Sequence, residues 1–411
     1  MLFAVNPVWE RIPTFSIWYE VVMFEKALTG SKGYYTWLAF LGIFIATGVA
    51  CYLYQFNEGL RITGLSRDVS WGLYIAQFTF LVGVAASAVM LVLPYYLHDV
   101  KAFGKITILG EFLAIASVTM CLLFIFVDLG NPTRILNVIL YPTPTSVLFW
   151  DMIVLNVYLI LNILIGWNVL AAERKGVAPP KWVKPLIYLS IPWAVSIHTV
   201  TAFLYAGLPG RHFWLSAIMA VRFLGSAFAA GPALLVILAL IVRRATGFDA
   251  GNEALKKLIN IITYALLASI FFVILELFTA FYSQIPGHMQ AFQYLFWGLE
   301  GHNKYTTWTW VSVGMGLTSA LLLVIPWTRN KMGIAAVACV GVFGALWIEK
   351  GLTLVVTGFI PNPLEHVVEY APTAPEVFIA LGVWATGFLV LTLLYKIAIS
   401  VKLDPNSASV H

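Results

Sequence analysis

The residues that could do chemistry in this sequence are polar side chains inside long apolar stretches. An ionisable group there is expensive and usually faces a cavity or a partner. His198 is the only histidine well inside such a stretch, and Asp151 lies near the start of another. An imidazole and a carboxyl group suit proton exchange near neutral pH. We therefore take His198 and Asp151 as the predicted proton-exchanging residues.

The exchange of electrons and protons with a quinone headgroup is the chemistry that this region suits. A quinol releases two protons, and its two oxygens need hydrogen-bond partners. An apolar wall rich in Trp, Phe and Leu would hold the ring and its isoprenoid tail. The predicted quinone-binding residues gather in the half of the membrane expected to face outward, and they are Trp71, Tyr74, Gln77, Asp151, His198 and Arg222.

A second, weaker hypothesis is a proton route across the membrane. Its candidate relay groups are the acidic residues Glu111, Asp128, Glu276 and Glu349. The sequence places Glu111 toward one side and Glu276 and Glu349 toward the other, and it does not show that a path connects them.

Structural interpretations stay open beside both hypotheses. His198 would then be a satisfied core histidine, and Asp128 would end a helix beside Arg134. Glu349 and Lys350 would belong to structural ion pairs between helices. Trp71 would be an interfacial aromatic residue, and the polar groups of Tyr74 and Gln77 would join helices by hydrogen bonds.

The cysteine and histidine content limits the redox groups that this chain can hold. The three cysteines are Cys51, Cys121 and Cys339, and no CxxC or CxxCH motif occurs. A membrane b-type haem usually needs two facing axial histidines, and His198 has no counterpart. We expect no haem, no iron–sulfur cluster and no metal site in this chain, so electrons must pass to a partner subunit that carries a redox centre.

The composition excludes a water-soluble enzyme, a disordered chain and a nucleic-acid-binding protein. Only 10% of the 411 residues are charged and 61% are hydrophobic, against about 25% charged in soluble domains. Runs of about 20 apolar residues, long enough to cross a bilayer as a helix, recur ten times. They lie near 36–56, 71–96, 106–127, 148–170, 185–207, 214–242, 258–282, 306–326, 332–357 and 376–402. The predicted fold class is an all-α integral membrane protein with ten transmembrane helices.

The positive residues predict the orientation. With ten spans both ends of the chain share one side, and 17 of the 24 Lys and Arg residues lie on that side against five on the other. This split predicts cytoplasmic termini in the cytoplasmic (inner) membrane. Residues 1–35 are predicted to be a cytoplasmic interfacial segment, 36–402 the membrane domain, and 403–411 a cytoplasmic tail.

Several stretches resemble the NrfD/polysulfide-reductase membrane-subunit family, in its ten-span branch. They are 70–74, 81–86, 128–134, 146–151, 192–201, 206–211, 349–350, 358–361 and 369–373. Together they cover nearly the whole chain after residue 26. The run 67–128 is most similar to the quinone-interacting subunit of a sulfur-metabolising complex, and two other kinds of ten-span subunit are near alternatives.

This resemblance implies two four-helix bundles, about 71–207 and 214–357, flanked by the first and last spans. It implies that Asp151 and His198 line a menaquinone site near the outer face, whereas at Tyr74 and Gln77 the chain lacks the Asn and His of shorter relatives. The implied partners are a periplasmic, ferredoxin-like iron–sulfur subunit, a multihaem cytochrome c, other complex subunits and membrane lipids. The chain would serve a quinol-dependent oxidoreductase complex in sulfite or sulfate metabolism without a redox centre of its own.

Two other classes of protein remain as alternatives. One is a secondary transporter or proton-conducting subunit without a quinone site, although the paired broken helices of many transporters are not evident. The other is a structural anchor for partner subunits. A quinone bound in stoichiometric amount would favour the quinone-interacting subunit over both of these alternatives.

Overall fold

The computed structural model describes residues 27–403. Ten helices in that range are long and apolar enough to cross a membrane. The spans are α2 with η2 (Lys32–Ile62), α3 to α4 (Leu73–Leu97), α5 (Thr107–Asp128), α7 (Val147–Arg174), α8 (Val183–Ala206), α9 (Met219–Thr246), α10 (Asn252–Tyr282), α12 (Thr306–Val324), α14 to α15 (Met332–Thr357) and α16 (Ala374–Lys402). The prediction of an all-α membrane protein with ten spans is confirmed.

Short helical segments interrupt or connect these spans. The connecting segments are η4 (Lys101–Phe103), η5 (Pro132–Arg134), α6 (Asn137–Leu140), η6 (His212–Trp214), α11 (Pro286–Trp297) and α13 (Pro326–Arg329). Inside spans lie η3 (Ala86–Ala88) and the π-helical η7 (Trp347–Thr353). The interfacial segment is predicted at 1–35, and its residues 1–26 lie outside the described residues. Residues 32–35 belong to α2, which begins at Lys32.

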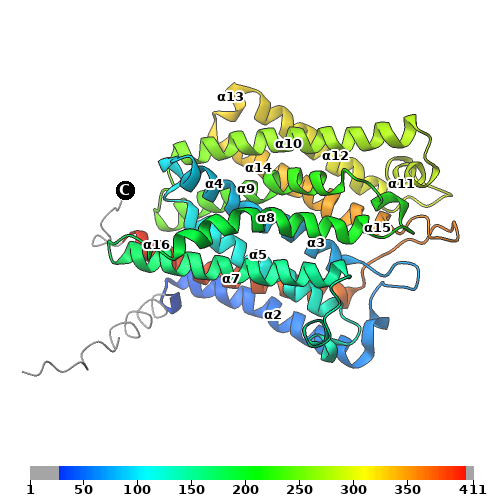
Figure 1. The fold of residues 1–411 in the computed structure, drawn as a ribbon, viewed down its shortest axis with the longest axis horizontal. Coiled ribbons are helices and arrows are strands. Elements are labelled where there is room, and N and C mark those ends of the chain that lie inside the picture. Colours follow the sequence, from blue (N-terminus) through cyan, green and yellow to red (C-terminus); the bar gives the residue numbers. More distant parts are fainter. Residues whose placement is uncertain (1–26, 404–411) are drawn as a thin grey trace, which may run out of the picture.

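The spans pack as two rings of four helices with two helices beside them. α3, α5, α7 and α8 contact one another in turn, and we call them the first helix group. α9, α10, α12 and α14 form the second helix group in the same way. α2 packs along α16, and α16 packs on α5 (Figure 1). The two groups meet where α3 and α8 contact α9 and where α3 contacts η7.

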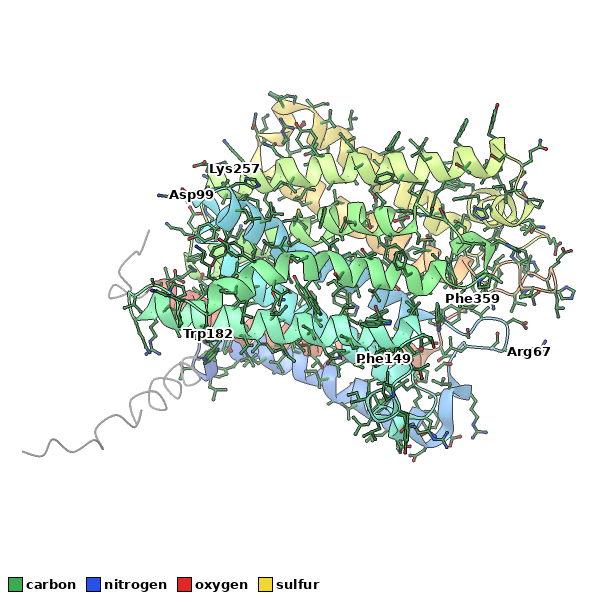
Figure 2. The ribbon with its side chains drawn as sticks, viewed as in Figure 1. Arg67, Asp99, Phe149, Trp182, Lys257 and Phe359 are labelled. Carbon is green, nitrogen blue, oxygen red and sulfur yellow. The ribbon has the colours of Figure 1, made fainter. Side chains whose placement is uncertain are left out.

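The two ends of the bundle differ in their connections. Arg67 and Phe359 lie at one end, and Asp99, Trp182 and Lys257 lie at the other (Figure 2). We call the first the long-loop end; its connections are 63–72, 129–146, 207–218, 283–305 and 358–373. The opposite end, with connections 98–106, 175–182, 247–251 and 325–331, is the short-loop end.

Glycine allows close approach of backbones at two helix contacts, as expected for membrane helices. A Cβ on Gly231 of α9 would lie 2.9 Å from the carbonyl oxygen of Val84, so the helix groups touch almost backbone to backbone there. A Cβ on Gly382 of α16 would lie 2.8 Å from the Cα of Gly48 on α2. The α2–α16 contact therefore has no room for a side chain.

Replacing Gly382 by valine should weaken the α2–α16 contact by about 1–3 kcal/mol, the usual cost of overpacking. Thermal unfolding of the purified protein in detergent measures this effect. Gly42→Val is the matched control, because a Cβ on Gly42 meets nothing within 4 Å. Equal melting temperatures for the two variants would contradict the close packing.

Candidate functional site

His198 lies on α8 and is 1% exposed. Its Nδ1 is 2.9 Å from the carbonyl oxygen of Ala194, one turn earlier on the helix. Because a carbonyl oxygen only accepts, Nδ1 carries the hydrogen when the ring is neutral, and the Nε2 lone pair is free. Nε2 makes no hydrogen bond of ordinary geometry among the described residues, and the backbone of Gly83 on α3 lies beside the ring. The ring therefore offers a bare acceptor in a buried setting.

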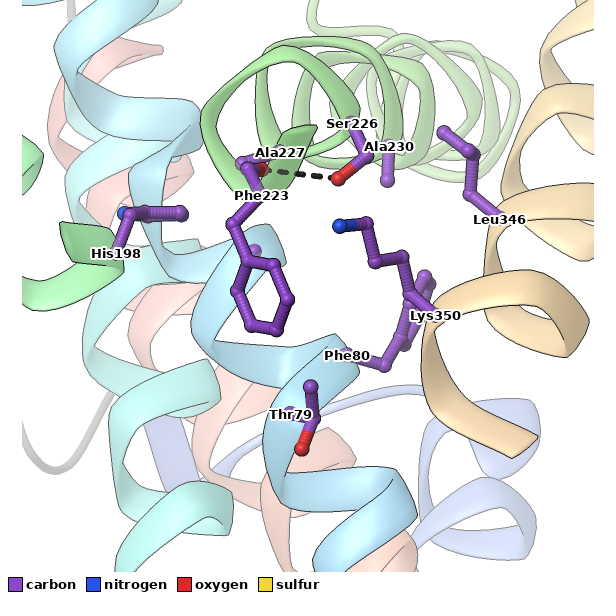
Figure 3. A pocket seen from close by; sticks show the side chains of 10 residues that line it. Thr79, Phe80, His198, Phe223, Ser226, Ala227, Ala230, Leu346 and Lys350 are labelled. Carbon is purple, nitrogen blue, oxygen red and sulfur yellow. Dashed lines mark hydrogen bonds between the residues drawn. The ribbon is translucent and has the colours of Figure 1, made fainter. Parts of the chain in front are cut away.

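His198 lines a small cavity between the two helix groups (Figure 3). The lining residues are Thr79, Phe80, Gly83, His198, Phe223, Ser226, Ala227, Ala230, Leu346 and Lys350. They come from α3, α8, α9, α14 and η7. His198 precedes the end of α8 by eight residues, which places the cavity about 12 Å below the long-loop end. The cavity volume is about 10 Å³, room for about one water molecule.

Asp151 lies near the start of α7 and is 1% exposed. Its Oδ1 accepts a hydrogen bond of 2.7 Å from the hydroxyl of Thr201 on α8. Thr201 and His198 are three residues apart and share one face of α8. Asp151 does not line the cavity and makes no hydrogen bond with His198. Thr201 therefore links Asp151 to the helix face that carries the histidine.

An aromatic cluster lies between the cavity and the long-loop end. The Trp71 ring stacks on Trp214 with centroids 5.5 Å apart and meets the Tyr205 ring edge-on at 5.4 Å. Trp214 in turn meets Phe359 at 5.1 Å. The Tyr205 hydroxyl pairs with that of Thr79, a cavity residue. The predicted residue Trp71 thus contributes to an apolar cover on the long-loop side of the cavity.

Arg211 covers the aromatic cluster on the side of the long-loop end. Its guanidinium lies over the Phe359 ring, 4.4 Å from the centroid. Partial burial lowers the pKa of the Arg211 guanidinium, and the Asp68 carboxylate opposes that shift. A cationic side chain therefore covers the rings at the long-loop end.

Tyr74 and Gln77 point away from the cavity. The Tyr74 hydroxyl donates to Gln55 Oε1 on α2 at 2.7 Å. Gln77 Oε1 accepts hydrogen bonds from the indoles of Trp347 at 2.8 Å and Trp384 at 3.0 Å. Both residues join helices, the structural interpretation that the sequence left open. The structure therefore does not bring them together with His198 and Asp151.

Arg222 forms a buried charge cluster with two of the predicted relay groups. Its guanidinium pairs with Glu276 of α10 and with Glu349 of η7. One carboxylate oxygen of each glutamate, Glu276 Oε1 and Glu349 Oε2, has no partner within residues 27–403. The neighbouring Phe223 lines the cavity, whereas Arg222 does not. Glu349 forms an ion pair between helices with Arg222, whereas the Lys350 Nζ makes no hydrogen bond or close ion pair in the described chain.

The other two acidic residues lie apart from this cluster. Glu111 is 2% exposed near the short-loop end of α5, and neither of its carboxylate oxygens has a hydrogen-bond partner in the described range. Asp128 ends α5 at the long-loop end. No ion pair joins Asp128 to Arg134 in the part of the chain that the structure describes. The four predicted relay residues thus occupy three separate places.

Sequence reasoning missed several residues around the cavity. Thr201 and Tyr205 follow His198 at helical spacing, so their shared face could have been found from the sequence. Phe223 and Lys350 come from the second helix group, and no local pattern pairs them with α8. No group of three His, Cys, Asp or Glu side chains that could hold a metal ion occurs between residues 27 and 403.

A bundle of ten spans with a buried histidine between two helix groups defines a multi-pass, all-α membrane protein. The model of the family "Polysulphide reductase, NrfD" matches residues 61–362, and the chain belongs to this family. The resemblance inferred from the sequence is therefore confirmed at the family level.

Three similar proteins come from different organisms. The chain is 27% identical over 397 residues to a putative dimethyl sulfoxide reductase membrane subunit of Halobacterium salinarum, covering 86% of this chain and 89% of the relative. It is 26% identical over 420 residues to a selenate reductase subunit of Mesobacillus selenatarsenatis, covering 91% and 94%. It is 21% identical over 394 residues to an Hdr-like menaquinol oxidoreductase integral membrane subunit of Archaeoglobus fulgidus, covering 92% and 96%. These relatives are subunits of reductases or oxidoreductases.

Proposed function

We propose that this protein is the quinone-interacting membrane subunit of a respiratory redox complex and exchanges electrons between the menaquinone pool and a partner subunit. The observation that carries the proposal is His198 Nε2, a buried ring nitrogen that lines a cavity between two helix groups and has no partner within residues 27–403. A relative over nearly the full length is named a menaquinol oxidoreductase subunit, which supports menaquinone as the substrate.

The residues around the cavity suit a quinol headgroup. A bound quinol supplies two electrons and two protons. His198 is held by Ala194 in the tautomer that leaves Nε2 free, so Nε2 accepts a hydroxyl proton. The second proton goes to Asp151, which does not line the cavity, by way of the Thr201 hydroxyl that donates to its Oδ1. The rings of Trp71, Tyr205 and Trp214 exclude water from the long-loop side.

The cavity volume sets a condition on binding. A cavity of about 10 Å³ admits a water molecule and not a quinone ring. The polar side chains of the cavity suit a headgroup, but the cavity must enlarge before a headgroup can enter. Phe223 forms part of the wall and is a single side chain whose rotation enlarges the space. We therefore assign Phe223 as the side chain that moves when a headgroup enters.

The partners and the membrane side follow from charge and resemblance. The long-loop end carries few Lys and Arg residues, which supports a periplasmic location for that end and cytoplasmic termini in the inner membrane. An iron–sulfur subunit docked there would lie about 12 Å from His198 along the axis of α8, with a multihaem cytochrome c among the other subunits. The resemblance of 67–128 to DsrP, the quinone-interacting subunit of the DsrMKJOP complex, supports a role in sulfur metabolism.

Bound menaquinone in the purified complex tests this function. Lipid extraction of the wild-type complex should yield about one menaquinone per copy of this chain. Asp151→Asn keeps the size of the side chain and gives Thr201 a weaker acceptor, and it should lower the retained menaquinone about tenfold, because the face of α8 that carries His198 is then held less firmly. Asp249→Asn, on the exposed short-loop side, is the control. Wild-type complex without menaquinone would contradict the proposal.

Proton movement across the membrane is a further part of this proposal. Glu111 near the short-loop end and the Arg222 cluster near the long-loop end lie at opposite ends of the bundle, as a route would require. In proteoliposomes with an enclosed pH-sensitive dye, turnover should change the internal pH, and Glu111→Gln should abolish the change while quinol oxidation continues. An unchanged signal in Glu111→Gln would end the idea.

A further inference from the structure

Lys350 is a buried amine that the proposed function has not used. It is 4% exposed, and its Nζ has no hydrogen-bond partner within residues 27–403. The Nζ lies 3.9 Å from the centroid of the Phe223 ring, on the wall of the cavity that His198 also lines. A buried cation without a hydrogen-bonding partner is costly. Lys350 therefore lacks a polar contact at the cavity.

The neighbouring polar groups do not supply that contact. Glu349 and Glu276 are both paired with Arg222, which does not line the cavity. Glu349 and Lys350 form no ion pair within 4.0 Å among the described residues, and the charges of Glu349 and Glu276 act on Lys350 only from a greater distance. The Ser226 hydroxyl donates to backbone carbonyls of its own helix.

The π-helical segment η7 is the reason for this arrangement. Within four residues it sends the Trp347 indole to Gln77, the Glu349 carboxylate to Arg222, and the Lys350 side chain into the cavity. A π-helical insertion changes the angle between successive side chains and occurs often at functional sites. The π-helical turn therefore places side chains against both helix groups.

His198 and Lys350 reach the cavity from opposite sides, with the Phe223 ring between them in the view (Figure 3). The first belongs to the first helix group and the second to the second group. A quinone carries its two oxygens at opposite ends of one ring. Two nitrogens that make no hydrogen bond of ordinary geometry in the described chain, one on each side of an apolar slot, match that geometry.

We propose that Lys350 is the second polar contact of the quinone headgroup, so that the binding site is completed by the second helix group. The inference rests on the function proposed above and adds a residue to the same site. The ammonium donates a hydrogen bond to the headgroup oxygen opposite His198. Displacement of Phe223 by the ring brings both contacts into reach.

Photolabelling of the wild-type complex with an azido-quinone tests the inference without any variant. Adducts should map to the peptide that contains η7 and to the peptide of α8 that contains His198. Labelling of α8 together with first-group helices alone, and not of η7, would overturn the role of Lys350 and leave the quinone function standing. Labelling of neither segment would overturn both, and the cavity would then hold only water.

Variants at Lys350 give a second measurement. Lys350→Met preserves the apolar stem and removes the donor, and it should raise the KM for quinol about tenfold with a smaller change in kcat. Lys350→Arg should restore most of the affinity. Lys331→Met is the control, because Lys331 lies over Trp327 near the short-loop end. If folded Lys350→Met had the KM of wild type while His198→Gln lost its menaquinone, the role of Lys350 would be refuted and the quinone function would stand.

Discussion

Arg222→Met should destabilise the protein by about 3–5 kcal/mol, the cost of removing one partner from a buried charge network. Arg222 is the cation that pairs with both Glu276 and Glu349, and its side chain is 4% exposed. Its removal leaves two carboxylates close together in a low-dielectric interior. We expect a lower melting temperature in detergent and less protein in the membrane.

Removal of the two carboxylate charges should reverse this loss. The triple variant Arg222→Met, Glu276→Gln, Glu349→Gln removes all three charges and should regain most of the lost stability. Arg243→Met is the control, because Arg243 pairs loosely with Asp249 at 3.5 Å near the short-loop end and is exposed. If Arg222→Met unfolded at the same temperature as Arg243→Met, the cluster would not be a stabilising network.

His198→Gln should lower the rate of quinol oxidation by about 10²–10⁴-fold, the usual contribution of a general base. Glutamine occupies a similar volume and keeps a hydrogen-bonding group, but it cannot exchange a proton. The measurement is quinol oxidation by the purified complex, followed by absorbance with an artificial electron acceptor.

Two comparisons make the histidine result specific. His98→Gln changes an exposed histidine at the end of α4 and should leave the rate unchanged. The melting temperature of His198→Gln should stay close to that of wild type, since the contact of Nδ1 with Ala194 is the one hydrogen bond of ordinary geometry that the ring makes within residues 27–403. A rate equal to that of wild type would remove His198 from the mechanism.

The sequence predicts the spans well because lipid leaves few choices for the backbone. Every backbone group must be satisfied within the membrane, so an apolar run of sufficient length becomes a helix. The run predicted at 106–127 is observed as Thr107–Asp128, and the run at 376–402 as Ala374–Lys402. The first span extends beyond its apolar run, from Lys32 to Ile62, because polar ends continue the helix outside the hydrocarbon core.

The position of a residue along its span can also be predicted from the sequence, whereas its direction around the helix axis cannot. His198 and Gln77 both lie in the halves of their spans nearer the long-loop end, yet one lines the cavity and the other bonds to two indoles. Tyr74 meets Gln55, a residue of a span that no local pattern connects to it. Partners from distant helices decide which polar group faces a cavity.

The direction of the Lys350 side chain could not be predicted from the sequence either. The adjacent Glu349 and Lys350 suggest a local ion pair, but the π-helical turn separates their directions. Glu349 meets Arg222, and Lys350 enters the cavity. A single inserted residue in a helix is invisible to a count of apolar residues, and here it decides which side chains reach the site.

The most direct measurement of the central claim is an electron-microscopy map of the intact complex in lipid nanodiscs with added menaquinone. We expect density for a quinone ring between α3, α8, α9 and η7, with one oxygen about 2.7–3.2 Å from His198 Nε2 and Phe223 rotated away from its present position. Ring density at another site, with the His198 cavity still closed, would contradict the account.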